Sequence, residues 1–109
     1  MDDTFLRTML FDFYGDLLTE KQRECYDLHF NQDLSLQEIA EQYGASRQAV
    51  WDLVRRAESV LREIEEKTGL VARAVQRRAK VRELLALAKR LPESAEKTQL
   101  LEKLELLED

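Results

Sequence analysis

Residues 35–57 are SLQEIAEQYGASRQAVWDLVRRA, and the spacing within this stretch decides the fold. Ala40, Gly44 and Val50 stand where two helices joined by a tight turn need a small residue, a turn-former and a buried apolar anchor. Ala40 allows the helices to cross closely, and Gly44 can adopt a positive φ without a Cβ clash. Val50 would face into the angle between the helices with three apolar neighbours, Ile39, Leu53 and Val54. The stretch therefore predicts a helix-turn-helix.

Capping patterns mark where these helices begin. Ser35 and Glu38 have the spacing of a capping box, in which each side chain bonds the backbone N–H of the other residue. Ser46 is a favourable N-cap for the second helix of the pair. Thr19 and Gln22 repeat the capping-box spacing earlier in the chain. The sequence thus predicts helix starts after residues 19, 35 and 46.

Apolar periodicity fills in the remaining helices. We expect helices from residue 3 or 4 to 14 (with Gly15 as the stop), from 19 to about 33, over 36–43, from 46 to 67, over 70–91 and from 94 to the C-terminus. The prediction is an all-α bundle of five to six helices. It forms one domain over 1–109, with a helix-turn-helix core at 19–67 and a long helical extension at 70–109, which would also suit dimerisation.

Composition excludes several protein classes. The single cysteine, Cys25, allows no internal disulfide, and this fits a reducing compartment. The longest unbroken apolar run, residues 84–88, is far too short to span a membrane. The N-terminal residues lack the basic region and apolar core of a secretory signal. We therefore expect a cytoplasmic protein that does not insert into a membrane.

Residues suited to catalysis or metal binding are sparse. Cys25 and His29 lie four apart on one helix, but two ligands do not make a metal site. The same pair lacks an orienting third group for nucleophilic catalysis, and the chain has no glycine-rich phosphate loop. We expect both side chains to be packing residues. The sequence predicts no enzyme, no metal site and no cofactor.

Charge is unevenly distributed along the chain. The net charge of −5 disfavours simple binding to duplex DNA, because duplex affinity rests largely on phosphate neutralisation. Residues 69–91, however, carry seven Lys or Arg and one Glu. In this segment one helical stripe is apolar, formed by Leu70, Ala74, Val81, Leu85 and Ala88. Basic residues flank the stripe on both sides: Arg73, Arg77 and Lys80 on one, and Arg78, Arg82 and Lys89 on the other.

Three interpretations of this basic helix remain open. We favour internal pairing with acidic side chains, within the chain or across a homodimer; the available partners are Asp12, Asp16, Glu96, Glu102, Glu105 and Glu108. A second interpretation is contact with the phosphates of DNA or RNA. A third is contact with an acidic protein partner. Under the second and third, the contact residues are Arg73, Arg77, Arg78, Lys80 and Arg82.

The second helix of the helix-turn-helix carries the residues that would approach bases and phosphates: Arg47, Gln48, Trp51, Arg55 and Arg56. Asp52 lies in the same region and would repel phosphate. The residues support equally a solvated helix face, in which Asp52 pairs with Arg56 at i,i+4 and Arg55 pairs with its neighbours. Trp51 is either packed under the helix over 70–91 or exposed as a binding anchor. We expect packing.

The order of motifs resembles a known family. The motifs are Phe13-Tyr14, Leu17-Leu18-Thr19-x-Lys21-Gln22, Asp33-Leu34-Ser35-Leu36-x-Glu38-Ile39-Ala40 and Ser46-Arg47-Gln48-Ala49-Val50-x-Asp52. Over about the first 60 residues the chain resembles the YlxM family of small bacterial helix-turn-helix proteins. The same stretch is similar to region 4 of sigma-70-type factors, which recognises promoter DNA. Asp52 and the acidic first third depart from that DNA-binding pattern. Trp51 replaces a more usual Tyr of the family, and the tail after Leu70 is unusually rich in Arg.

The resemblance implies a role but no chemistry. Genes of the YlxM family lie beside those of the signal recognition particle protein and its receptor in Gram-positive bacteria. The first hypothesis is therefore an accessory or regulatory protein of that pathway, with DNA, signal recognition particle RNA, the particle's protein or its receptor as partner. The second is a transcriptional regulator that dimerises through the last two helices. The third is a structural adaptor that binds no nucleic acid.

Overall fold

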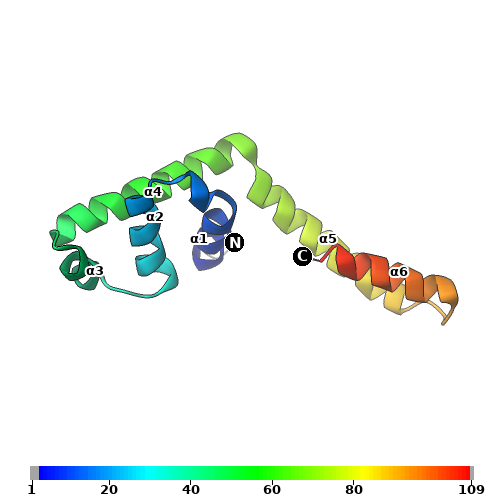
Figure 1. Ribbon diagram of the computed structural model, residues 1–109. Coiled ribbons are helices and arrows are strands. Elements are labelled where there is room, and N and C mark those ends of the chain that lie inside the picture. Colours follow the sequence, from blue (N-terminus) through cyan, green and yellow to red (C-terminus); the bar gives the residue numbers. More distant parts are fainter. Residues whose placement is uncertain (1–2, 109) are drawn as a thin grey trace. The chain divides into compact units, whose positions relative to one another are not determined.

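The computed structural model describes residues 3–108, and within them the chain is helical and contains no strand (Figure 1). The α-helices are α1 (Asp3–Tyr14), α2 (Glu20–Tyr26), α3 (Leu36–Tyr43), α4 (Arg47–Thr68), α5 (Leu70–Lys89) and α6 (Ala95–Leu106). Residues Gly15–Leu17 form a 3-10 turn and Asp27–Asn31 a π-helical turn. The all-α prediction is confirmed. Contacts group the chain into two compact units, up to residue 71 and from residue 72.

The core of the first unit lies where α2, α3 and α4 meet. Figure 1 shows α1, α2 and α3 on one side of the long α4. Ile39 and Ala40 of α3 pack with Val50 and Val54 of α4, and all four are at most 1% exposed. Cys25 of α2 completes this cluster. The residues expected to face into the angle between the helices do so, and the helix-turn-helix is confirmed.

The turn and the caps have the predicted geometry. Gly44 ends α3 in the left-handed conformation, with φ of +62°. Ser35 Oγ accepts a hydrogen bond from the Glu38 backbone N–H, while the Glu38 carboxylate accepts one from the Ser35 N–H. Thr19 and Gln22 form the same reciprocal pair. Ser46 accepts from the Ala49 N–H and caps α4.

A second layer joins α1 to the C-terminal half of α4. Leu10 and Leu61 are both fully buried. Arg7 Nε donates to Glu58 Oε1 at 2.7 Å, and the guanidinium of Arg7 lies 4.5 Å from the centre of the Phe30 ring. These contacts explain why α4 is 22 residues long, since its second half is held by α1. The helix ends at Gly69, which has φ of +64° and separates α4 from α5.

The predicted helix over 19–33 is interrupted. The α-helical part ends at Tyr26, and residues Asp27–Asn31 widen into a π-helical turn. The Leu34 N–H donates to the Leu28 carbonyl at 2.9 Å, and the Leu34 carbonyl bonds His29 Nδ1 at 2.8 Å. These bonds, between residues five and six positions apart, fold the chain back before α3. The apolar periodicity of a helix does not depend on such bonds, so the sequence pattern did not predict the interruption.

The second unit is a hairpin of α5 and α6. Val81, Leu85 and Ala88 of α5 pack against Leu104 of α6, with Leu101 at the edge. This confirms the predicted stripe at three of its five positions, whereas Leu70 is 45% exposed. Lys97 Nζ donates to the Lys89 carbonyl at 3.1 Å. The fifth helix ends at Lys89 instead of residue 91, and α6 at Leu106.

Within residues 3–108, none of the helices has the length and hydrophobicity needed to cross a membrane.

Candidate nucleic-acid interface

The first three turns of α4 present one buried and one exposed side. The buried side consists of Val50, Val54 and Ala57, each at most 1% exposed. At 100° per residue, Gln48, Arg55 and Arg56 fall on the opposite half of the helix, whereas Trp51 lies about 90° and Arg47 about 50° from the centre of the buried side. All five are exposed: Arg47, Gln48, Trp51, Arg55 and Arg56. We call this surface the α4 face. The helix-turn-helix core thus fixes the backbone beneath the α4 face while its side chains meet solvent.

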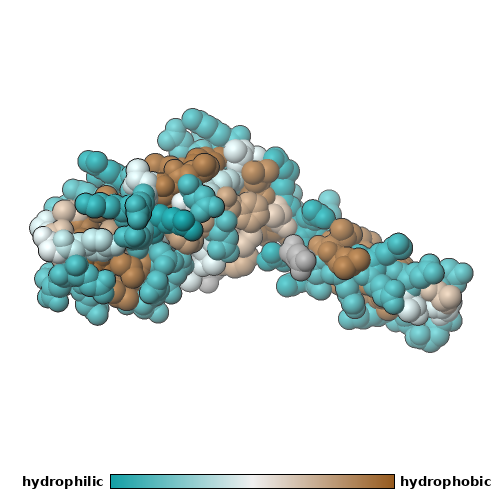
Figure 2. All heavy atoms as spheres, viewed as in Figure 1, coloured by the Kyte–Doolittle hydropathy of each residue, from teal (hydrophilic) through white to brown (hydrophobic). Residues whose placement is uncertain are grey.

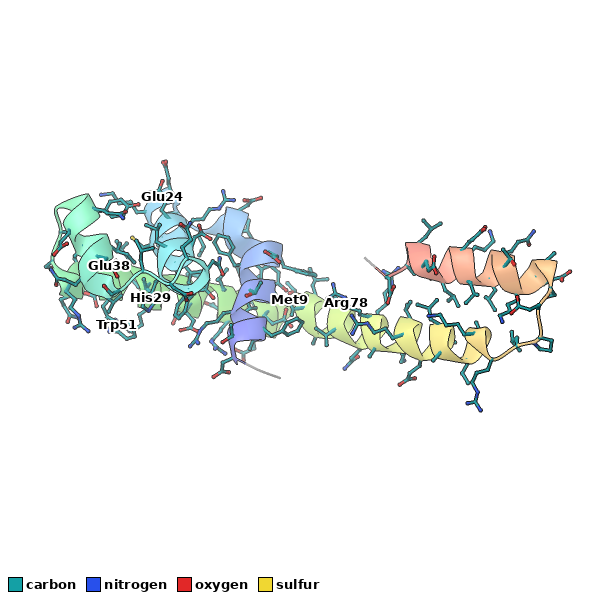
Figure 3. The ribbon with its side chains drawn as sticks, turned by 90° about the horizontal axis from the view of Figure 1, so that it is seen from below. Met9, Glu24, His29, Glu38, Trp51 and Arg78 are labelled. Carbon is teal, nitrogen blue, oxygen red and sulfur yellow. The ribbon has the colours of Figure 1, made fainter. Side chains whose placement is uncertain are left out.

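Trp51 corrects a prediction. The side chain was expected to pack under the helix over 70–91, but it is 41% exposed. Figure 3 shows Trp51 projecting from α4 at the margin of the first unit. Its neighbours one helical turn away on either side are Arg47 and Arg55, both exposed. An exposed indole between two guanidinium groups is suited to stacking on a base.

Arg55 pairs with a neighbour, Asp52, as predicted, but Asp52 does not pair with Arg56. The Asp52 carboxylate accepts a hydrogen bond from Gln48 Nε2 at 3.3 Å and lies 3.8 Å from Arg55. The predicted pair with Arg56 does not form, because the Asp52 side chain is directed toward residues 48 and 55 instead. Within the described residues, Arg47 and Arg56 take part in no ion pair. One carboxylate therefore offsets only part of the charge of three guanidinium groups.

A group of acidic side chains of the first unit lies beside α2. An open cavity beside α2 is lined by Asp16, Glu20, Glu24 and Asp27. Arg23 lies among them and pairs with Asp16 at 3.1 Å. These four carboxylates of the acidic first third of the chain therefore lie beside α2 and not on α4. The start of α4 adds the partial positive charge of a helix N-terminus.

The basic residues predicted on the fifth helix belong to the second unit: Arg73, Arg77, Arg78, Lys80 and Arg82. Arg82 pairs at 3.7 Å with Glu108, just beyond the end of α6, as the internal-pairing interpretation expects. Asp16, expected as a partner of the basic helix, pairs with Arg23 instead. Arg77, Lys80 and Arg82 are exposed, and Arg78 is half-buried.

Cys25 and His29 are packing residues, as predicted. Burial raises the pKa of the Cys25 thiol, which keeps the thiol protonated and makes it a poor nucleophile. The His29 ring lies against Phe30 with centroids 4.8 Å apart. Among the described residues, no group of three His, Cys, Asp or Glu side chains is placed to hold a metal ion.

Sequence reasoning missed two polar contacts that join helices of the first unit. The Tyr43 hydroxyl donates to the Glu24 carboxylate and ties α3 to α2; this bond raises the pKa of Tyr43 to about 12. The Tyr14 hydroxyl donates to Glu65 at 2.6 Å and ties α1 to the end of α4. Neither pair is close in sequence, so no local pattern could have found it.

Known proteins are similar in sequence to this chain over most of its length. A family model described as "Putative helix-turn-helix protein, YlxM / p13 like" matches residues 1–106. A UPF0122 protein of Halalkalibacterium halodurans is 44% identical over 108 residues, 99% of each chain. The UPF0122 protein YlxM of Bacillus subtilis is 42% identical over 108 residues, 99% of this chain and 98% of the relative. A UPF0122 protein of a Thermoanaerobacter species is 55% identical over 74 residues, 67% of this chain and 63% of the relative.

Proposed function

Since the chain belongs to the YlxM / p13-like family of helix-turn-helix proteins, we propose that it binds nucleic acid through the α4 face and performs no catalysis. The observation that carries the proposal is the composition of this face. Three exposed guanidinium groups and an exposed indole lie on the first three turns of one helix, with a single carboxylate among them. In a helix-turn-helix, the N-terminal part of this helix approaches bases and phosphates.

The side chains of the α4 face are suited to contact both the phosphates and the bases of a nucleic acid. Arg47 and Arg56, which have no ion pair within the described residues, are available to phosphates. Gln48 can form paired hydrogen bonds with an adenine edge. In the free protein Gln48 donates to Asp52, so binding would exchange this bond for one to a base. Trp51 supplies an aromatic surface beside them.

We propose further that the protein is a cytoplasmic accessory or regulatory factor of the signal recognition particle pathway. The support is the gene neighbourhood of the family that the sequence resembles. Signal recognition particle RNA is then the first candidate ligand, and the particle's protein or its receptor would be the neighbouring partner. Arg77, Arg78 and Arg82 of α5 would provide a second contact for phosphates or for acidic side chains.

Duplex DNA is the second candidate ligand, and the helix-turn-helix geometry itself favours it. A transcriptional regulator would place the α4 face in the major groove. A structural adaptor, in contrast, would bind neither nucleic acid. The three alternatives differ in which labelled ligand binds, so one titration separates them.

The test is an anisotropy titration of labelled signal recognition particle RNA and of labelled random duplex DNA. Arg47→Ala is the informative variant, and Lys67→Ala, at the far end of the same helix, is its matched control for charge. We expect Arg47→Ala to weaken binding by about 1–3 kcal/mol, roughly 5- to 150-fold. Lys67→Ala should change binding less than about threefold. Equal losses in the two variants, or no binding to either ligand at low salt, would refute the proposal.

A further inference from the structure

The hairpin of the second unit leaves a row of leucines uncovered. Its inner side is filled by Val81, Leu85 and Leu104. Along one edge runs an apolar groove of about 250 Å³, lined by Leu84, Leu87, Ala88, Leu91, Leu100 and Leu104. Four of these leucines are 40–59% exposed. Figure 2 shows apolar side chains gathered on the hairpin among charged ones. We call this surface the leucine groove.

The register of the hairpin sets which leucines lie level with each other. Arg82 pairs with Glu108, and the Lys89 carbonyl accepts from Lys97 Nζ. Between these two contacts, Leu100 of α6 lies level with Leu87 of α5. Leu84 lies about one helical turn to one side of this level and Leu91 about one turn to the other. The leucine groove is therefore nearly symmetric about the line that joins Leu87 and Leu100.

We propose that the leucine groove binds a second copy of this chain. A two-fold axis that runs along the line joining Leu87 and Leu100 brings two hairpins face to face. Each helix then runs antiparallel to its equivalent in the second copy. Leu84 then meets Leu91 of the second copy, and Leu87 and Leu100 meet their own equivalents. The product is a four-helix bundle in which every neighbouring pair of helices is antiparallel, a common packing arrangement. The inference stands apart from the proposed function.

Charges beside the groove fit a second copy better than another partner. Glu96 precedes Leu100 by four residues and Lys103 follows it by three, so both flank Leu100 on the groove side. Both are exposed, and within the described residues neither forms an ion pair. About the proposed axis, Glu96 faces Lys103 of the second copy, and the same contact occurs twice. Such reciprocity is what a two-fold interface requires.

The size of the hairpin face that carries the leucine groove sets the expected affinity of dimerisation. This face is about 18 Å long, the length of a twelve-residue helix, and about two helices wide. A face of these dimensions covers roughly 360 Å² of each copy, which places the interface below the range of about 1,200–2,000 Å² in total that stable interfaces bury. We therefore expect a reversible dimer with a dissociation constant on the order of micromolar.

Sedimentation velocity of the full chain from about 1 to 300 µM tests the proposal, a range that brackets a micromolar constant. We expect the wild type to pass from monomer to dimer. Leu100→Glu should stay monomeric over this range while retaining its helical circular dichroism. Leu87→Glu, at a position already 59% exposed, repeats the test where folding is least disturbed. A wild type that remains monomeric, or a dimer that survives both variants, would overturn the proposal.

A charge exchange distinguishes self-association through this face from any other arrangement. Glu96→Lys should weaken dimerisation by about tenfold or more, because it places Lys opposite Lys twice. The double variant Glu96→Lys with Lys103→Glu should restore the wild-type constant to within about threefold. Glu102→Lys makes the same charge change on the far side of α6 and should have little effect. Failure of the double variant to recover would show that the proposed axis is wrong.

Discussion

Gly44 provides a sharp test of the turn on which the helix-turn-helix depends. It adopts φ of +62° and ψ of +33°, a conformation that costs an L-residue about 1–2 kcal/mol. A Cβ added at Gly44 would meet no heavy atom within 4 Å, so no steric term is added. Ala would also restrict the unfolded chain, which offsets about 0.4–1 kcal/mol of the cost. Gly44→Ala should therefore lower the free energy of unfolding by about 1 kcal/mol.

The assay is urea unfolding followed by the fluorescence of Trp51, which lies in the same unit as the turn. Gly44→Asn is the matched control, because Asn tolerates the left-handed conformation better than Ala. Its loss should be smaller than that of Ala, and both proteins should keep their native fluorescence. If Ala stabilised the protein, or if Asn cost as much as Ala, the reasoning from backbone conformation would be wrong.

Three further predictions concern the packing of α1 and α2 against α4. Leu61→Ala, at a fully buried position, should lower the free energy of unfolding by about 2–5 kcal/mol in urea denaturation. Burial alone would raise the pKa of Glu58, but hydrogen bonds from Arg7 and Arg62 outweigh burial and hold the pKa below its ordinary value of 4.5. The stabilisation from Glu58 should thus be present above pH 4.5 and be lost as pH falls through the lower folded-state pKa. Urea unfolding of Glu58→Gln should show less acid sensitivity than the wild type. Burial raises the pKa of Tyr26 from 10 to about 12, so its contribution to stability should be complete below pH 10 and decline between pH 10 and 12. Tyr26→Phe should flatten that part of the unfolding profile.

Local patterns in the sequence were sufficient for the helix-turn-helix. The Ser35–Glu38 capping box and the positive φ of Gly44 depend on residues within a few positions of each other, and the structure contains both. The apolar spacing that placed Val50 in the core is likewise local. The π-helical turn after Tyr26 depends instead on bonds from Leu34 back to Leu28 and His29, which helical periodicity does not encode.

The candidate site shows where sequence reasoning reaches its limit. Helical periodicity placed Trp51 away from Val50, but it could not say whether another element covers the indole, and the packed alternative was wrong. Asp52 has opposite charges within reach at both i+3 and i+4. The choice of Arg55 over Arg56 follows from its side-chain direction, together with the bond from Gln48. Rotamer choice of this kind is set by the assembled surface and not by residue spacing.

The emission of Trp51 also tests directly whether the α4 face binds nucleic acid. Trp51 is the only tryptophan in the chain, so its emission reports on this face alone. Unlabelled signal recognition particle RNA and random duplex DNA would each be titrated into the wild-type protein from low to moderate salt. We expect saturable quenching by at least one ligand, at concentrations that rise with salt. Binding detected by anisotropy without any change in Trp51 emission would contradict the proposal that nucleic acid binds the α4 face, because the nucleic acid would then contact another surface.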